Sequence, residues 1–219
     1  MKLDTTFSNG LSTNSGAFNI TRVNQKYWVT SRQAIFEFND DLKPKPVFYQ
    51  KDLVTFNSLF TDKNKNIWVG SNAGLFVMSP KKQKIDFFSL DQFGIPSRIY
   101  PGRLAYSKNA NAIYLAGDSC LFKIPLNKFF PAEKIPAPVD PTGIAVDEKD
   151  RIWVAMEDRH FYLFNEGNKT FIRAKDLNWP EIETNRLWQL ACFDGHTLIG
   201  ISSNEVYWMD TRNPNWNVN

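Results

Sequence analysis

The sequence contains few of the residues from which catalytic and metal sites are usually built. Among its 219 residues there are two cysteines and two histidines. Cys120 and Cys192 stand among apolar neighbours, which favours buried free thiols, because a disulfide framework in a chain of this size uses more cysteines. His160 and His196 are widely separated, so neither a metal site nor a nucleophile–base pair is indicated. No catalytic residue, metal ligand or cofactor is predicted.

Long hydrophobic runs and localised charge are also absent. No window of about 18 apolar residues exists, so no membrane-spanning helix is predicted. Residues 1–10 are polar and lack the apolar core of a signal peptide, and no Gly-rich phosphate loop is present. The formal net charge is +3, but the basic residues are scattered, and the densest run, Lys81 to Lys84, is interpreted as a solvated turn. Nucleic-acid binding is therefore not expected.

Aromatic residues are abundant, and some of them recur at a fixed period. They make up 15% of the chain, with 18 Phe and 7 Trp. Five segments align on a bulky residue in a short apolar run, at Trp28, Trp68, Tyr114, Trp153 and Leu198. Intervals of about 40 to 45 residues between short strands are typical of the four-stranded blades of a β-propeller.

Each repeat divides into four short strands separated by turns rich in Asn, Asp, Gly and Lys. The second repeat shows this most clearly, with strands expected at 55–60, 67–71, 75–78 and 84–90. We therefore predict an all-β fold, a single propeller domain over 1–219 with about five blades, at 16–50, 54–90, 101–136, 142–175 and 186–210. Since the gap between blades widens outward, one large ring per blade would fill it. This assigns a structural role to Trp28, Trp68, Tyr114 and Trp153.

The two ends of the chain suggest how the ring of blades is completed. Residues 2–7 form an apparent outer strand that no blade precedes, and the last repeat stops near Met209 after its third strand. Strand 2–7 would then complete the last blade and remove exposed sheet edges. A fragment of a larger propeller would show the same phasing, and this alternative stays open.

Two segments carry a family resemblance. Residues 9–14 read Asn-Gly-Leu-Ser-Thr-Asn and are followed by Trp28-Val29-Thr30-Ser31; the second repeat runs from Asp62 through Trp68-Val69-Gly70-Ser71 to Gly74-Leu75. This pattern resembles the two-component-regulator propeller repeat, in which Gly-Leu-Ser-x-Asn and Leu-Trp-Val-Gly-Thr recur in each blade. The match is uneven, because the third repeat has Tyr114 for Trp and the fifth retains only Thr197 to Gly200.

The resemblance implies a sensor. Members of this family form the periplasmic sensing region of hybrid two-component systems in Bacteroidetes, where many respond to oligosaccharides. It implies a non-catalytic, periplasmic, ligand-sensing propeller for an oligosaccharide or another small ligand, and a homodimer stays an open alternative. The family's sensor regions usually contain more than five blades, and this chain has no kinase, transmembrane or DNA-binding segment.

Propellers bind ligands at one mouth, which is built from the turns between second and third strands and from the links between blades. Six residues on these segments are the candidate ligand contacts: Trp179, Arg159, His160, Asp158, Tyr100 and Arg103. Trp179 and Tyr100 lie in the two long links, and a Trp in a loop beside polar groups is suited to stacking on a sugar.

Two other functions compete with sensing. One is a protein-interaction propeller without a small-molecule site, which would expose an apolar patch on one face. The other is an enzyme, because Gly143 to Asp147 is similar to segments of lactonase and streptogramin-lyase propellers. The innermost strands are mostly apolar, as at Leu59-Phe60 and Leu190-Ala191, which disfavours the enzyme.

Overall fold

The computed structural model describes residues 19–23, 25–32, 34–38, 43–49, 54–79, 84–96, 103–127, 131–177, 187, 189–202 and 205–218. These residues form five four-stranded antiparallel sheets and two short 3-10 helices, η2 (Leu90–Phe93) and η3 (Ala174–Leu177). The predicted fold class, an all-β propeller with five four-stranded blades, is confirmed. The chain divides into two compact units, with blades 1 and 2 in the first and blades 3 to 5 in the second.

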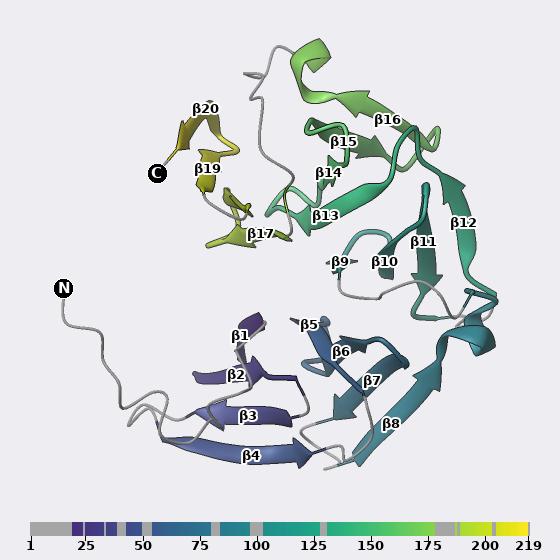
Figure 1. Ribbon diagram of the computed structural model, residues 1–219, viewed down its shortest axis with the longest axis vertical. Coiled ribbons are helices and arrows are strands. Elements are labelled where there is room, and N and C mark those ends of the chain that lie inside the picture. Colours follow the sequence, from purple (N-terminus) through teal and green to yellow (C-terminus); the bar gives the residue numbers. More distant parts are fainter. Residues whose placement is uncertain are drawn as a thin grey trace. The chain divides into compact units, whose positions relative to one another are not determined.

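Strand order follows chain order in all five described sheets, so each blade is a simple meander (Figure 1). In the first unit, blade 1 comprises β1 (Asn19–Val23), β2 (Lys26–Thr30), β3 (Ala34–Phe38) and β4 (Pro44–Tyr49). Blade 2 comprises β5 (Phe56–Thr61), β6 (Ile67–Ser71), β7 (Gly74–Ser79) and β8 (Lys84–Ser89).

The second unit contains the remaining twelve strands described. Blade 3 comprises β9 (Leu104–Ser107), β10 (Ala112–Gly117), β11 (Cys120–Pro125) and β12 (Glu133–Pro136). Blade 4 comprises β13 (Pro141–Val146), β14 (Ile152–Met156), β15 (Phe161–Asn165) and β16 (Thr170–Arg173). Blade 5 comprises β17 (Gln189–Phe193), β18 (Thr197–Ile201), β19 (Val206–Asp210) and β20 (Asn213–Val218).

The fifth blade has its own fourth strand, so the prediction that the last repeat stops after its third strand is wrong. β20 pairs with β19 in antiparallel register, with Tyr207 opposite Val218 and Met209 opposite Trp216. Its sequence, Asn-Pro-Asn-Trp-Asn-Val, gives a weak strand signal because Asn and Pro are poor strand formers, and Pro is tolerated on an outer strand. Residues 2–7, which were expected to complete this blade, lie outside the described residues.

A buried aspartate fixes the turn between the first two strands of blades 2 and 4. The Asp62 carboxylate accepts hydrogen bonds from the Asn64 and Asn66 amides at 2.8 and 2.9 Å and from Trp68 Nε1 at 3.0 Å. Asp147 repeats this arrangement, and its Oδ2 accepts the Trp153 Nε1 bond at 3.0 Å. One side chain therefore holds both the turn and the large ring of its blade.

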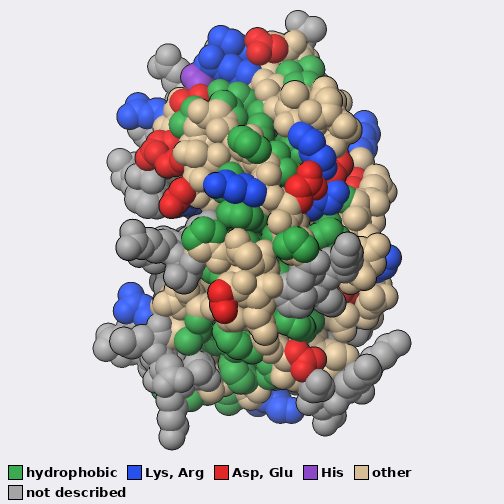
Figure 2. Space-filling view, turned by 90° about the vertical axis from the view of Figure 1, so that its right-hand side faces the viewer, with side chains coloured by type: hydrophobic (Ala, Val, Ile, Leu, Met, Phe, Trp, Pro, Cys, Tyr) green, Lys and Arg blue, Asp and Glu red, His purple; other side chains and the backbone are tan. Residues whose placement is uncertain are grey.

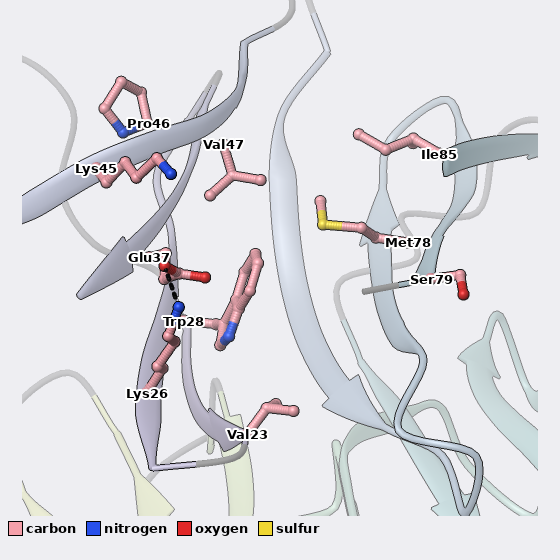
Figure 3. A pocket seen from close by; sticks show the side chains of 10 residues that line it. All are labelled: Val23, Lys26, Trp28, Glu37, Lys45, Pro46, Val47, Met78, Ser79 and Ile85. Atoms are coloured by element: carbon pink, nitrogen blue, oxygen red, sulfur yellow. Dashed lines mark hydrogen bonds and ion pairs between the residues drawn. The ribbon is translucent and has the colours of Figure 1, made fainter. Parts of the chain in front are cut away.

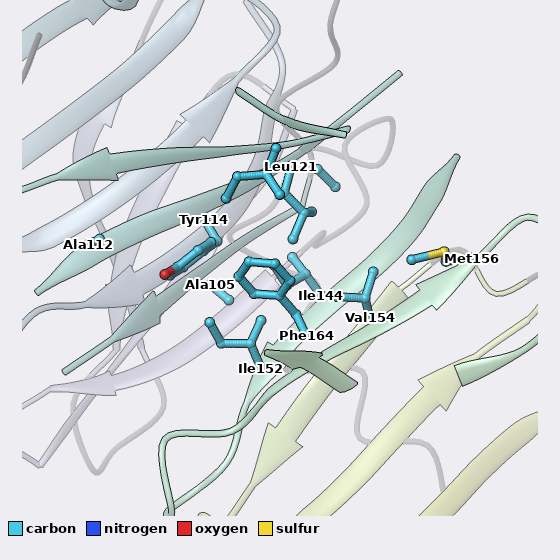
Figure 4. Packing of buried hydrophobic residues seen from close by; sticks show 11 residues of the cluster. Ala105, Ala112, Tyr114, Leu121, Ile144, Ile152, Val154, Met156 and Phe164 are labelled. Carbon is cyan, nitrogen blue, oxygen red and sulfur yellow. The ribbon is translucent and has the colours of Figure 1, made fainter. Parts of the chain in front are cut away.

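Alternate residues of each blade supply the cores on its two sides. In β14, Ile152, Val154 and Met156 pack toward blade 3 (Figure 4), whereas Trp153 and Ala155 pack toward blade 5. This is the two-residue period of a strand buried on both faces. The four predicted structural rings are all buried, with 5% of Trp28, 2% of Trp68 and none of Tyr114 or Trp153 exposed.

Leu198 does not occupy the position of the blade ring in the fifth repeat. It packs with Trp153 in the core between blades 4 and 5, so it faces the preceding blade. Its neighbour Ile199 stands on the side of β18 that corresponds to Trp153 in β14. The residue that corresponds to the Trp positions is therefore Ile199, one residue after Leu198. A shift of one residue along a strand moves a side chain to the opposite face of the sheet.

Both cysteines are free thiols, with Cys120 buried and Cys192 half-buried. Among the described residues, none belongs to a helix with the length and apolarity needed to cross a membrane.

Candidate functional site

The turn between the second and third strands of blade 4 carries three of the predicted contacts. Met156 donates its amide hydrogen to the His160 carbonyl at 3.1 Å, and Arg159 donates to the Met156 carbonyl at 3.0 Å. Arg159 has a φ of 69° and is exposed. Asp158 accepts bonds from the His160 amide at 3.2 Å and from the Tyr162 hydroxyl at 2.7 Å. The turn is therefore closed by its own backbone and braced by Tyr162.

His160 is braced from the outer part of the same blade. Its Nε2 contacts a guanidinium nitrogen of Arg173, a residue of β16 that stands opposite Tyr162. Burial, followed by the hydrogen bond to Asp158, raises the pKa of Tyr162 to about 12. Tyr162 is thus a neutral donor at physiological pH, and Asp158 and His160 have fixed orientations on this turn.

Arg103 forms hydrogen bonds that connect blade 3 to blade 4. Its guanidinium donates to the Pro141 carbonyl at 3.0 Å, and its own carbonyl accepts the Ala116 amide at 3.1 Å. Arg103 precedes β9 and Pro141 begins β13, so this contact ties the starts of two innermost strands together. The other two predicted contacts, Trp179 and Tyr100, lie outside the described residues.

Sequence reasoning missed Asp140, which connects the turns of blades 3 and 4 at this end. Its carboxylate accepts bonds from the amide and the hydroxyl of Ser119 at 2.7 and 2.6 Å, and its carbonyl accepts the Glu157 amide at 2.9 Å. An Asp before Pro141 in a link between blades was the available signal, since Asp commonly accepts bonds from nearby turns. Asp118, Ser119, Asp140 and the 157–160 turn thus form a continuous polar rim within the second unit.

Two cavities lie between neighbouring blades, and no rim residue lines either of them. One, of about 570 Å³, lies in the first unit between blades 1 and 2 (Figure 3). The other, of about 500 Å³, lies in the second unit between blades 3 and 4 and is lined by charged side chains that include Lys123, Asp150 and Glu166, of which Lys123 and Glu166 form an ion pair. On the face drawn in Figure 2, acidic and basic side chains are interspersed.

One side of blade 5 exposes apolar side chains. Phe193, Ile201, Val206 and Trp208 are 65%, 42%, 42% and 38% exposed. They stand on the face opposite the core shared with blade 4, because Leu198, Tyr207 and Met209 on the alternate positions fill that core.

The two histidines lie at opposite ends of their blades. His160 is in the turn that follows β14, whereas His196 is in the turn that precedes β18, with its Nδ1 3.4 Å from Asp194. The described residues contain no group of three or more His, Cys, Asp or Glu side chains arranged to hold a metal ion. Within this part of the chain, the rim is suited to hydrogen bonding with a ligand.

Comparison with known proteins supports the propeller class. No protein-family model matches the chain, and no curated protein matches it. Among solved structures, the extracellular domain assigned to the one-component system BT4673 of B. thetaiotaomicron is 13% identical, with a TM-score of 0.66 over 88% of this chain. This chain spans only 27% of that domain. At such identity the likeness shows the fold.

Two further structures are similar to it. Virginiamycin B lyase from Staphylococcus aureus is 14% identical, with a TM-score of 0.69 over 95% of this chain and 71% of the lyase. A chain of a nidogen/laminin complex is 10% identical, with a TM-score of 0.73 over 93% of this chain and 80% of its own length. An extracellular domain of a signalling system, a lyase and a chain of a nidogen/laminin complex are thus similar in fold to this chain.

Proposed function

We propose that this chain is a non-catalytic ligand-sensing propeller, the extracytoplasmic sensor part of a two-component signalling protein. Its ligand is an oligosaccharide or another small polar molecule. The observation that carries the proposal is the braced 157–160 turn, where Asp158 is held by Tyr162 and His160 by Arg173. Polar groups with fixed orientation lose little conformational entropy on binding, so they suit recognition.

The fold likeness supports the signalling context. Besides BT4673, the extracellular domain assigned to the hybrid two-component system BT3049 of B. thetaiotaomicron is similar, with a TM-score of 0.67 over 94% of this chain. The sequence resemblance to two-component-regulator repeats points the same way. An extracytoplasmic location belongs to this proposal.

The rim residues have complementary roles in this proposal. The exposed Arg159 guanidinium donates several hydrogen bonds in one plane, which fits vicinal hydroxyls or a carboxylate. Asp158 accepts from ligand hydroxyls, and His160, whose Nε2 contacts Arg173, fixes the shape of the turn beside it. Trp179 and Tyr100 remain predicted ligand contacts, and the Trp179 ring would stack on the apolar face of a sugar.

A thermal-shift screen of neutral and acidic oligosaccharides tests the proposal, with affinities of the hits measured by calorimetry. We expect Arg159→Gln and His160→Gln each to weaken a hit by about tenfold, which is about 1.4 kcal/mol. Lys149→Gln, an exposed residue in the turn at the other end of blade 4, serves as the control and should leave affinity unchanged. A ligand whose affinity is unchanged by both rim substitutions, or the absence of any binding oligosaccharide, would contradict the proposal.

A lyase is the second candidate, because virginiamycin B lyase covers nearly the whole chain. Proton abstraction needs a base within reach of the substrate, and here His160 is engaged by Arg173 while His196 lies at the other end of its blade. Incubation with virginiamycin B, followed by liquid chromatography and tandem mass spectrometry, decides between the two, because ring opening by elimination changes the fragmentation but not the mass. Ring opening that is abolished by His160→Ala would establish catalysis.

A protein-interaction propeller is the third candidate, and the exposed apolar side of blade 5 favours it. Under this hypothesis no oligosaccharide binds in the screen, and Trp208→Asp weakens complex formation in a pull-down with the cognate signalling protein. Under the sensing proposal, Trp208→Asp leaves the affinity for a ligand hit unchanged.

A further inference from the structure

The cavity in the first unit has the size and lining of a small-molecule site. Its volume of about 570 Å³ falls within the range of known ligand pockets, about 300–1,000 Å³. Blade 1 lines one side with Val23, Lys26, Trp28, Glu37, Lys45, Pro46 and Val47, and blade 2 lines the other with Met78, Ser79 and Ile85 (Figure 3). All of the charged side chains come from blade 1.

Strand register places the polar members of this lining in one row. Trp28 of β2 stands opposite Glu37 of β3, and Glu37 stands opposite Lys45 of β4. Directly opposed residues on one face have Cβ atoms about 4.5–5.5 Å apart. A flat ring, a carboxylate and an ammonium group are therefore presented side by side along the cavity wall.

Trp28 differs from the corresponding Trp residues of blades 2 and 4. Trp68 and Trp153 donate their indole hydrogens to Asp62 and Asp147, but the strand register puts Val23 at that position in blade 1. In the described part of the chain the Trp28 indole nitrogen has no hydrogen-bond acceptor, although the ring is only 5% exposed. The cavity thus contains a donor without a protein acceptor among these residues.

Among the described residues that line the cavity, two lysines accompany one carboxylate. Lys26 is paired with Glu37 at 2.8 Å, and Lys45 extends toward the cavity from β4 (Figure 3). The cavity between blades 3 and 4 behaves differently, because Glu166 of blade 4 reaches across and pairs with Lys123 of blade 3. Blade 2 supplies no such carboxylate among the residues lining the first cavity.

We propose that the cavity between blades 1 and 2 binds a small carboxylate-bearing ligand with a flat, weakly polar face. This face contacts the small part of the Trp28 ring that the cavity exposes, an oxygen of the ligand accepts the Trp28 indole hydrogen, and the carboxylate pairs with Lys45. A uronic-acid sugar and an aromatic acid share this chemistry. The lining of this cavity shares no residue with the rim on blades 3 and 4, so the site goes beyond the sensing proposal.

Calorimetry on the full chain at low salt tests this, with digalacturonic acid and benzoate as probes and lactose and benzyl alcohol as their neutral counterparts. We expect at least one acid to bind about threefold or more tightly than its neutral counterpart, the range of a partly solvated ion pair. Lys45→Gln should abolish this preference. Trp28→Phe, which keeps a ring but removes the donor, should weaken the acid about threefold or more. Lys63→Gln, an exposed lysine of blade 2, is the charge-matched control.

Each outcome decides the proposal. Binding of digalacturonic acid alone identifies an acidic sugar, binding of benzoate alone identifies an organic acid, and both support the site. An acid preference that survives Lys45→Gln in a variant with wild-type thermal unfolding, or no acid binding at all, would overturn it. Lys45→Gln should leave the affinity of any hit that depends on Arg159 and His160 unchanged, so failure here and failure of the sensing proposal are distinguishable.

Discussion

The Tyr114 hydroxyl donates a hydrogen bond to Glu166 Oε2 at 2.5 Å, which anchors the large ring of blade 3 in blade 4. Trp68 and Trp153 are instead anchored by an Asp in the turn of their own blade. Ser107 occupies that Asp position in blade 3, and its hydroxyl donates to Asp150 of blade 4 at 2.5 Å. Blade 3 has Tyr where blades 2 and 4 have Trp, and Ser where they have Asp. As a result, the hydrogen bonds that anchor its ring and its turn run to blade 4 and not to residues of blade 3.

Removal of the Tyr114 hydroxyl should weaken the contact between blades 3 and 4. Tyr114→Phe deletes a part-buried bond from a fully buried ring to a charged group, so we expect a loss of about 1–3 kcal/mol in the free energy of unfolding. Urea denaturation followed by circular dichroism measures it. Tyr49→Phe, at a ring that is 60% exposed, should have almost no effect, and an equal loss in both variants would contradict the anchoring role.

Acid should destabilise the protein partly through Glu166. Burial alone raises the pKa of this carboxyl, but hydrogen bonds from Lys123, Lys169 and Tyr114 outweigh it and hold the pKa below its ordinary value of 4.5. Since the folded state lowers this pKa, the contribution is present above pH 4.5 and is lost as the pH falls through the folded value. Glu166→Gln should lower stability at pH 6 and flatten the decline between pH 5 and 3. A decline as steep as that of the wild type would contradict this.

The turn aspartate of blade 2 should matter far more than its counterpart in blade 5. Asp62→Ala leaves the buried Trp68 indole hydrogen without its acceptor, and we expect a loss of about 1–3 kcal/mol. Asp194 also accepts turn amides, from His196 and Thr197, but it is exposed and holds no ring. Asp194→Ala should therefore shift the unfolding midpoint much less, and comparable shifts would refute the buried-ring explanation.

Substitution of two glycines by alanine should distinguish the cost of backbone strain from the cost of steric contact. Gly94 and Gly195 both have positive φ, at 70° and 85°. A Cβ at position 94 meets nothing within 4 Å, whereas one at 195 lies 3.2 Å from Glu148 Cβ. Gly94→Ala should cost about 1–2 kcal/mol from φ alone, and Gly195→Ala should cost more. Differential scanning calorimetry would measure the loss of stability in each variant. A smaller loss for Gly195→Ala than for Gly94→Ala would show that the turn containing Glu148 moves away from the new Cβ at no cost in stability.

Much of the fold was predictable because a β-strand imposes its pattern locally. The recurring apolar runs with a bulky ring, and the Asn, Asp and Gly turns between them, indicate four-stranded units from short-range chemistry alone. The prediction failed at β20, where the sequence is weakly strand-like and pairing with β19 supplies the stabilisation. It also failed at Leu198, because a shorter preceding turn shifts the phase by one residue.

The candidate sites depended on contacts that no local pattern encodes. Sequence alone determined that the chain repeats, that each repeat is a small sheet and that Trp28, Trp68, Tyr114 and Trp153 are its large rings. Only the tertiary structure decided which partner each ring has: Asp62 for Trp68, Glu166 for Tyr114, and a cavity for Trp28. The reason is physical, since the strand period selects which face a side chain takes, whereas its partner across that face comes from another strand, turn or blade.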